Sequence, residues 1–240
     1  MITWILPMAG RGTRSRALGE CKPAIKVAGR TIFEWCLTGL KLHLSETDKI
    51  VAVTTDYFEE KFKLSAVGGA WCKDNQVDFS LVKVPDVPPG PAASVATATE
   101  FISPQSPVII VNVDQFCVFE LPSFNKEWDV FMPLYVNTTG GSSYVLMKDG
   151  YIKSVAEKEM ISSYASAGVY GFKKGLILLD LLKDGLEREP NCLGEYYIAP
   201  MLNSLVPDKK ILATSLSVKC DLGNVDSIER FKAIVGCIFN

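Results

Sequence analysis

The sequence predicts an α/β fold with a Rossmann-like, mixed and mainly parallel sheet that is flanked by helices. In the first half of the 240 residues, short apolar runs alternate with segments of helical periodicity. Such alternation is typical of parallel strands joined by right-handed crossovers. The runs are apolar on both faces, as expected when helices cover both sides of a sheet. After residue 114 strand signals dominate, which predicts a small β-rich insertion.

Four apolar runs are expected to form the parallel strands. They are "ITWILP" (2–7), "KIVAVTT" (49–55), "VDFSLVKV" (77–84) and "PVIIVNV" (107–113). The intervening segment 31–42 places its apolar side chains on one face of a helix, namely Ile32, Phe33, Cys36, Leu37 and Leu40.

The second half is expected to hold the insertion and three more helices. Strand signals occur at 128–136, 142–147, 151–157 and 166–173, with a hairpin turn at Asp149-Gly150. We interpret these strands as a mixed-sheet insertion packed on the parallel half. Helices are expected at 175–186, 195–206 and 225–239, with a strand pair near 210–223. Since no repeat or linker interrupts the chain, we expect a single domain over residues 1–240.

Composition excludes several classes of function. The hydrophobic fraction of 48% and formal net charge of -2 indicate an ordinary globular protein without the basic excess that binds nucleic acid. No apolar run reaches the roughly 18 residues of a membrane span, and no leader is evident, so we expect a cytoplasmic protein without membrane contact. The seven cysteines form no C-x-x-C pair and are expected to be reduced thiols. A lone histidine, His43, leaves no basis for a Ser-His-Asp triad or a His-rich zinc site.

A glycine turn, "AGRGTR" (9–14), follows the first strand. Ligands of open parallel sheets gather outside the carboxyl ends of the strands, where "PDVPPGP" (85–91) and Asp114 are also expected. Residues 11–30 hold six arginines and lysines against one acid, Glu20. Glycine backbones and basic side chains bind phosphate, so the turn predicts a small polyanionic ligand. It matches neither a Walker A loop nor a dinucleotide fingerprint, whose third glycine is replaced by Ser15.

Several motifs together resemble one enzyme family. "GRGTR" followed by "KP" closely resembles the G-x-G-T-R…K-P motif of the sugar-phosphate nucleotidylyltransferases, the pyrophosphorylases that make nucleotide sugars. Four later segments are similar to this family in the expected order: "VIIVNVDQF", "VAEKEMISSYASAGVYGF", "GEYYIAPMLNSL" and "CDLGNVDSIERF". The resemblance implies a glycosyltransferase A-type nucleotidyltransferase fold. It also implies transfer of a nucleoside monophosphate from an NTP to a sugar 1-phosphate, with release of pyrophosphate, in nucleotide-sugar supply for cell-surface polysaccharide.

The resemblance also implies roles for individual residues. Arg14 and Lys22 are the expected catalytic residues, and Asp114 and Asp221 the expected ligands of Mg²⁺. Residues expected to bind the nucleotide are Ala9, Gly10, Gly12, Thr13, Gly90 and Asp114. Those expected to bind the sugar phosphate are Glu157, Lys158, Gly168 and Glu195. Cys21 before the lysine, the proline-rich base loop and Asn224 depart from the family pattern, and the base stays open.

The chemistry agrees with these residue types. A phosphate monoester has a second pKa of about 6, so a sugar 1-phosphate needs no general base to act as a nucleophile. Three other readings stay open: transfer to choline phosphate, a glycosyltransferase that uses a nucleotide sugar, and a nucleotide sensor without catalysis. Asn112-Val113-Asp114 is not the D-x-D of many glycosyltransferases, and Arg14 and Lys22 argue against a sensor. A homo-oligomer is compatible with the sequence.

Overall fold

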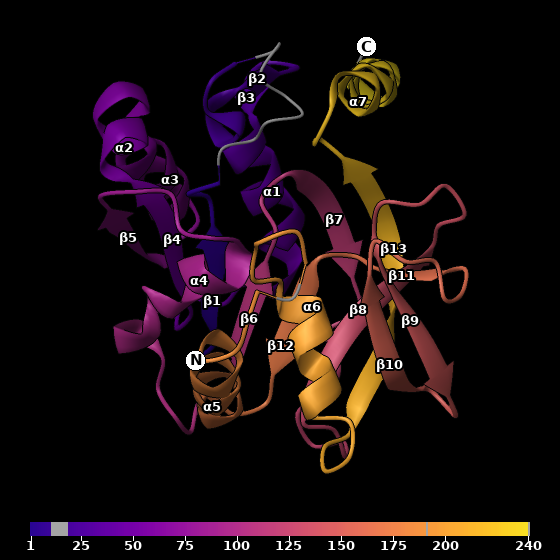
Figure 1. Cartoon of the computed structure of the whole chain (residues 1–240). Helices are drawn as coiled ribbons and strands as arrows, with labels where there is room; N and C mark the ends of the chain where they lie inside the picture. Colours follow the sequence, from indigo (N-terminus) through magenta and orange to yellow (C-terminus); the bar gives the residue numbers. More distant parts are fainter. Residues whose placement is uncertain (11–18, 191, 240) are drawn as a thin grey trace.

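The structure, a computed structural model, describes residues 1–10, 19–190 and 192–239. An eleven-stranded sheet of order β5-β4-β1-β6-β12-β8-β11-β9-β10-β13-β7 runs through them (Figure 1). The four predicted parallel strands form one side of it: β1 (Thr3–Pro7), β4 (Lys49–Thr55), β5 (Asp78–Val84) and β6 (Val108–Val111). In the registers of β1, Ile5 pairs with Val51 of β4 and with Ile110 of β6. The predicted fold class, a mainly parallel sheet with flanking helices, is confirmed.

Helices cover both faces of the parallel strands. They are α1 (Ile32–Leu40), α2 (Asp56–Phe62), α3 (Leu64–Asp74), α4 (Pro91–Ala96) and α5 (Gly175–Leu186). Two further helices contact the rest of the sheet, α6 (Ile198–Met201) at β10 and α7 (Val225–Phe239) at β13. Alternating side chains of β1 enter two cores, Ile5 on the side of α4 and α5 and Leu6 on the side of α1 and α3. A capping box fixes the start of α1, because Thr31 and Glu34 exchange side-chain to backbone hydrogen bonds of 3.1 and 2.7 Å.

The β-rich segment was expected to pack on the parallel half, but its strands instead extend the same sheet. Its strands are β7 (Gln115–Phe119), β8 (Val130–Val136), β9 (Ser143–Lys148), β10 (Tyr151–Glu157), β11 (Tyr164–Ser166), β12 (Val169–Phe172) and β13 (Ile211–Asp221). β12 pairs antiparallel with β6 through Tyr170 and Ile110. This pairing satisfies the backbone groups that β6 would otherwise expose as an edge strand.

Three elements differ from the sequence expectation. The run 166–173 is divided at Gly168, whose φ of +72° separates β11 from β12. Residues 211–221 form one strand, not a pair, because β13 pairs parallel with β8 along its first half and antiparallel with β7 along its second. The helix expected from Glu195 begins only at Ile198, since the preceding residues hydrogen bond to the loop before α4.

Other expectations concern burial and the lone histidine. β5 lies at the sheet edge and is only partly buried, unlike the double-sided apolar strand that was expected. His43 packs on Phe119 with ring centroids 4.4 Å apart, which agrees with a structural role. The cysteines whose side chains are described are free thiols. Among the described helices, none combines the length and the hydropathy that a bilayer span requires.

Candidate active site

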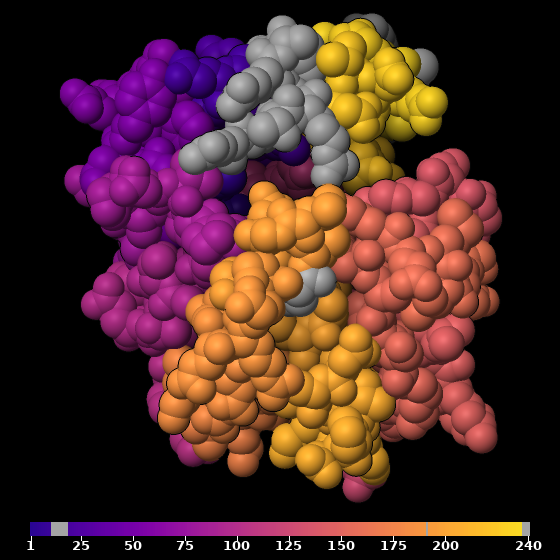
Figure 2. All heavy atoms as spheres, in the orientation of Figure 1, coloured from indigo at the N-terminus to yellow at the C-terminus, as the bar shows by residue number. Residues whose placement is uncertain are grey.

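Two adjoining cavities lie at the carboxyl ends of β1 and β6, where the ligand was predicted. The smaller, of about 180 Å³, follows β1 at Pro7, Met8 and Gly10. The larger, of about 410 Å³, extends toward β8 and β13. Both are lined by Lys22, Pro91, Asn112 and Asp114. Figure 2 shows the molecule hollowed at this end, between the purple N-terminal half and the orange and pink segments.

The glycine turn is described only in part. Ala9 is buried and Gly10 lines the smaller cavity. The other residues predicted there, Gly12, Thr13 and Arg14, lie outside the described residues. Their roles stay predictions, and the described geometry of the turn begins again at Gly19.

Lys22 and Asp114 form an ion pair where the two cavities meet. Lys22 begins the short 3₁₀ helix Lys22–Ala24, and its Nζ lies 3.0 Å from Asp114 Oδ2. Burial opposes ionisation of Asp114, but the ammonium groups of Lys22 and Lys219 together with a backbone hydrogen bond outweigh it and hold the pKa of this carboxyl below its ordinary value. Gly223 leaves room for the pair, because a Cβ there would lie 3.2 Å from Asp114 Oδ2 and 3.7 Å from Lys22 Nζ.

The sheet brings Asp221 next to Asp114. β13 pairs antiparallel with β7, so Asp221 lies opposite Gln115, and the N–H of Leu222 donates to the carbonyl of Asp114 at 2.8 Å. Both aspartates line the larger cavity. The two residues predicted to share a metal ion therefore border the same cleft, although they are more than a hundred positions apart in the sequence.

Lys219 is a second cation in this cleft that the sequence analysis did not predict. Its ammonium pairs with the Asp221 carboxylate and lies 4.9 Å from the centroid of the Tyr135 ring. Burial would lower the pKa of Lys219, but Asp221, with smaller contributions from Tyr135 and Asp114, outweighs it and the pKa lies above its ordinary value. Residues 219 and 221 share one face of β13, so recognising a continuous strand would have revealed the pair.

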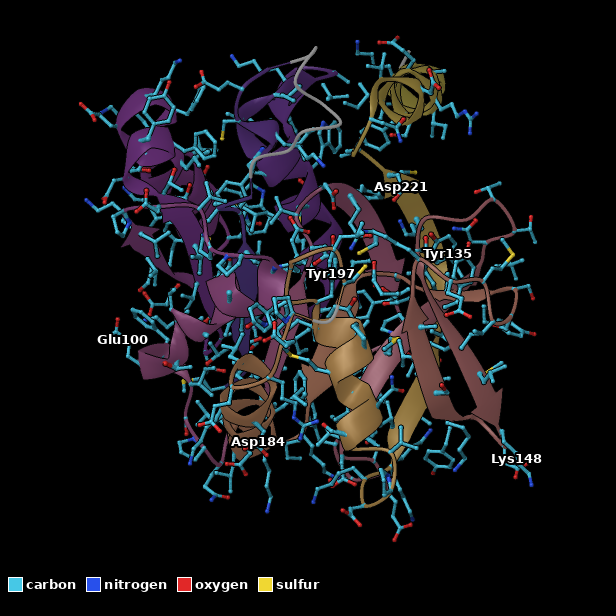
Figure 3. All side chains as sticks on the ribbon, in the orientation of Figure 1. Glu100, Tyr135, Lys148, Asp184, Tyr197 and Asp221 are labelled. Atoms are coloured by element: carbon cyan, nitrogen blue, oxygen red, sulfur yellow. The ribbon has the colours of Figure 1, made fainter. Side chains whose placement is uncertain are left out.

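The residues predicted to bind the sugar phosphate lie around Tyr197. Glu157 ends β10, lines the larger cavity and accepts a hydrogen bond from the Ser143 hydroxyl. Lys158 donates to Tyr197 Oη at 3.1 Å, and this hydroxyl donates to Glu195 Oε2 at 2.6 Å. Tyr197 lines the cavity, and Figure 3 shows it across the cleft from Tyr135 and Asp221. Tyr197 is not among the residues predicted from the sequence, although it belongs to the "EYY" motif.

Two predicted glycines allow close backbone approaches. A Cβ at Gly168 would lie 2.7 Å from Asn112 Nδ2, so this glycine lets β12 close against the residue after β6, and it lines the larger cavity. Gly90 has a φ of +101°, and a Cβ there would lie 2.6 Å from both the N and the O of Tyr196. Gly90 thus fixes the proline-rich loop against the segment before α6. Its contact with a base stays a prediction.

The carboxylates of Asp114 and Asp221 fit a magnesium ion. Hard oxygen donors are the ligands that Mg²⁺ prefers, and one or two carboxylates usually suffice beside phosphates and water. Each carboxylate here is paired with an ammonium, Lys22 or Lys219, so this wall of the cleft already attracts positive charge. In the described part of the chain, no three His, Cys, Asp or Glu side chains gather closely enough to hold an ion by themselves. Phosphate and water would therefore complete the coordination.

Comparison with known proteins agrees with this geometry. Residues 5–120 match the family model described as the MobA-like NTP transferase domain. This region is an NTP transferase domain. It contains Lys22 and Asp114 and the whole of the smaller cavity. The chain is a nucleotidyltransferase, and the predicted resemblance to the nucleotidylyltransferases is confirmed. No curated protein matches the chain by sequence.

Solved structures of low sequence identity share the fold of this NTP transferase. A nucleoside-diphosphate-sugar pyrophosphorylase from Vibrio cholerae RC9 is 20% identical with a TM-score of 0.84, over 97% of this chain and 100% of that one. A UDP-glucose pyrophosphorylase complexed with UDP-glucose is 15% identical with a TM-score of 0.78, over 99% and 100%. An inositol-1-phosphate CTP transferase from T. maritima is 14% identical with a TM-score of 0.75, over 98% and 95%.

Proposed function

We propose that this nucleotidyltransferase transfers a nucleoside monophosphate from an NTP to a sugar 1-phosphate, releasing pyrophosphate. The observation that supports it best is the Lys22–Asp114 pair at the junction of the two cavities. The smaller cavity beside the glycine turn is the place for the triphosphate, and the larger is the place for the acceptor. An ammonium at their junction reaches the phosphates of both. The product is a nucleotide sugar, which would supply glycosyl transfer such as cell-surface polysaccharide synthesis.

The reaction needs alignment and charge neutralisation more than proton transfer. An oxygen of the acceptor phosphate attacks the α-phosphorus, a new P–O bond forms, and the bond to the β-phosphate oxygen breaks with pyrophosphate taking the electron pair. Since the acceptor phosphate is largely dianionic near neutral pH, no general base is required. Lys22 then stabilises charge that grows on the transferred phosphoryl group. Arg14 has the same role in the proposal by its place in the motif.

Asp114 and Asp221 would hold Mg²⁺, which neutralises phosphate charge when bound. We expect EDTA to abolish activity and Mg²⁺ or Mn²⁺ to restore it. Asp114→Asn and Asp221→Asn should each raise the Mg²⁺ concentration needed for half-maximal activity. Full turnover in EDTA would refute the metal assignment.

The lining of the larger cavity favours a polyhydroxylated acceptor over choline phosphate. It carries hydroxyl and amide groups from Asn137, Thr139, Ser142, Ser143 and Ser166. A quaternary ammonium requires open aromatic faces. The rings of Tyr135 and Tyr197 already hold the ammonium groups of Lys219 and Lys158, at 4.9 and 4.8 Å. These lysines would repel a choline cation, whereas hydroxyl groups of a sugar find hydrogen-bond partners.

A pyrophosphate-release screen tests the proposal. The wild type and Lys22→Ala are incubated with Mg²⁺, each of five NTPs, and a panel of sugar 1-phosphates, inositol 1-phosphate and choline phosphate. We expect release with at least one sugar 1-phosphate, and its loss in the variant. Turnover only with choline phosphate would refute the acceptor class. Release that needs no acceptor, or that survives Lys22→Ala, would refute the mechanism.

A further inference from the structure

Lys219 lies on the acceptor side of the site. It lines the larger cavity together with Asp221, Tyr135 and Glu157, and it is absent from the lining of the smaller one. Lys22, in contrast, lines both cavities. The side chain of Lys219 is 12% exposed, so it is largely removed from solvent.

A buried ammonium requires an anion close to it, because removing the charge from water is costly. In the described part of the chain the ion-pair partner of Lys219 is Asp221, and the charge of Asp114 also acts on it. These are the two carboxylates that fit Mg²⁺. A metal ion bound to Asp221 would repel the neighbouring ammonium and take its partner away. The dianionic phosphate of the acceptor is then an anion that can replace Asp221 in the larger cavity, which Glu157 also lines.

We propose that Lys219 is a tethered cation that occupies Asp221 in the absence of metal, competes with the metal ion for it, and binds the acceptor phosphate once displaced. The inference has two halves, competition with the metal ion for Asp221 and binding of the acceptor phosphate. Only the second, the acceptor half, rests on the proposed function. Competition for Asp221 follows from the ion pair and requires no turnover. Because the ammonium returns to Asp221 when product and metal leave, the empty cleft keeps its charges paired.

The competition is tested by metal binding and not by activity alone. Free Mn²⁺ is counted by electron paramagnetic resonance in titrations of wild type, Lys219→Met, Lys219→Arg and Lys210→Met. The last is the matched control, since Lys210 pairs with Glu127 at the other end of β13 and is exposed. We expect Lys219→Met to bind Mn²⁺ about three- to tenfold more tightly, which is the size of a partly exposed ion pair. Lys210→Met and Lys219→Arg should bind as the wild type does.

The acceptor half is tested with the substrate pair that the screen identifies. Losing a charge-assisted contact should raise KM for the acceptor about tenfold to hundredfold in Lys219→Met, with KM for the NTP within about twofold. Lys219→Arg should recover most of the loss. Lys219→Met should thus bind Mn²⁺ more tightly and the acceptor more weakly. General damage to the fold would weaken both, and thermal melting of each variant checks that the fold is intact.

Two results would overturn the inference. Unchanged or weaker Mn²⁺ binding in a folded Lys219→Met protein refutes the competition, and an unchanged KM for the acceptor refutes the phosphate contact. If no NTP and acceptor release pyrophosphate, the proposed function fails and the acceptor half fails with it. The Mn²⁺ titration decides the competition in that case too.

Discussion

Lys22→Ala separates the proposed catalytic role of Lys22 from its contribution to stability. The ion pair with Asp114 is 3.0 Å long, with side chains that are 18% and 44% exposed. Solvent screens a carboxylate exposed to that extent, so the pair contributes about 1 kcal/mol or less to the free energy of unfolding. For a chain of this size, that corresponds to a fall in Tm of about 2 to 4 °C at most. The fold should therefore survive the change.

The effect on turnover should be larger. An ammonium that is already positioned at the junction of the two cavities stabilises charge that develops only as the α-phosphorus is attacked. Removing one such preorganised group lowers kcat by about 100-fold or more, which is about 2.7 kcal/mol of transition-state stabilisation. KM values should change less than kcat, since the interaction strengthens in the transition state.

The assay couples pyrophosphate release to inorganic pyrophosphatase and measures phosphate, and circular dichroism follows melting. Lys49→Ala is the matched control, because Lys49 pairs with Asp78 at 3.1 Å at the opposite end of the parallel strands. It should lose similar stability and keep full turnover. If Lys22→Ala turns over at a near-normal rate, or if both variants lose activity equally, Lys22 does not act at the reacting phosphates.

Three further predictions concern the rest of the site. Lys158→Met should raise KM for the acceptor about tenfold and leave KM for the NTP unchanged, because the Lys158 ammonium lies 4.8 Å from the Tyr197 ring at the proposed acceptor end of the cleft. Equal changes in both KM values would contradict this placement. Gly90→Ala should lower the free energy of unfolding by about 2 to 5 kcal/mol in a urea melt, because the added Cβ meets backbone atoms. The control Gly29→Ala has a similar positive φ but open space around the Cβ, and it should lower this free energy by about 1 kcal/mol. Equal losses in the two variants would refute the close approach at Gly90. Folding lowers the pKa of Asp114, so ionised Asp114 stabilises the protein above about pH 4, and this contribution is lost as pH falls through the folded pKa. In the absence of metal, Asp114→Asn should therefore lower the free energy of unfolding less at pH 3 than at pH 7.

The elements whose sequence signals are local could be predicted, both in the parallel half and beyond it. The strands at 49–55 and 78–84 and the helices at 175–186 and 225–239 follow from apolar periodicity and lie within a residue of their predicted bounds. Asp114 could be selected because it follows an apolar strand beside a glycine turn. In these places the chain needs no distant partner to specify its structure.

The features that sequence did not reveal depend on distant pairing. β13 is one strand because β8 and β7 pair with its two halves, and neither partner is visible in the run 211–221. Lys219 went unnoticed for the same reason, since its shared face with Asp221 exists only in that continuous strand. Residues 195–197 carry helical periodicity, yet they stay extended because the backbone of Tyr196 bonds to Pro89 and Ala92. Nonlocal hydrogen bonds outweighed local propensity there.

The short segment before α6 has a consequence for how this enzyme could change its substrates. The backbone of Tyr196 holds the proline-rich loop through Pro89 and Ala92, while the next side chain, Tyr197, holds Lys158. Two consecutive residues, Tyr196 and Tyr197, thus contact the proline-rich loop on one side and Lys158 on the other. A loop transplanted from a relative with another base preference would have to keep a glycine at position 90 and the same backbone partners, or Lys158 would move with it. With the predicted roles of Gly90 at the base and Lys158 at the acceptor, substitutions that alter the choice of base should be coupled in laboratory evolution to those that alter the choice of acceptor.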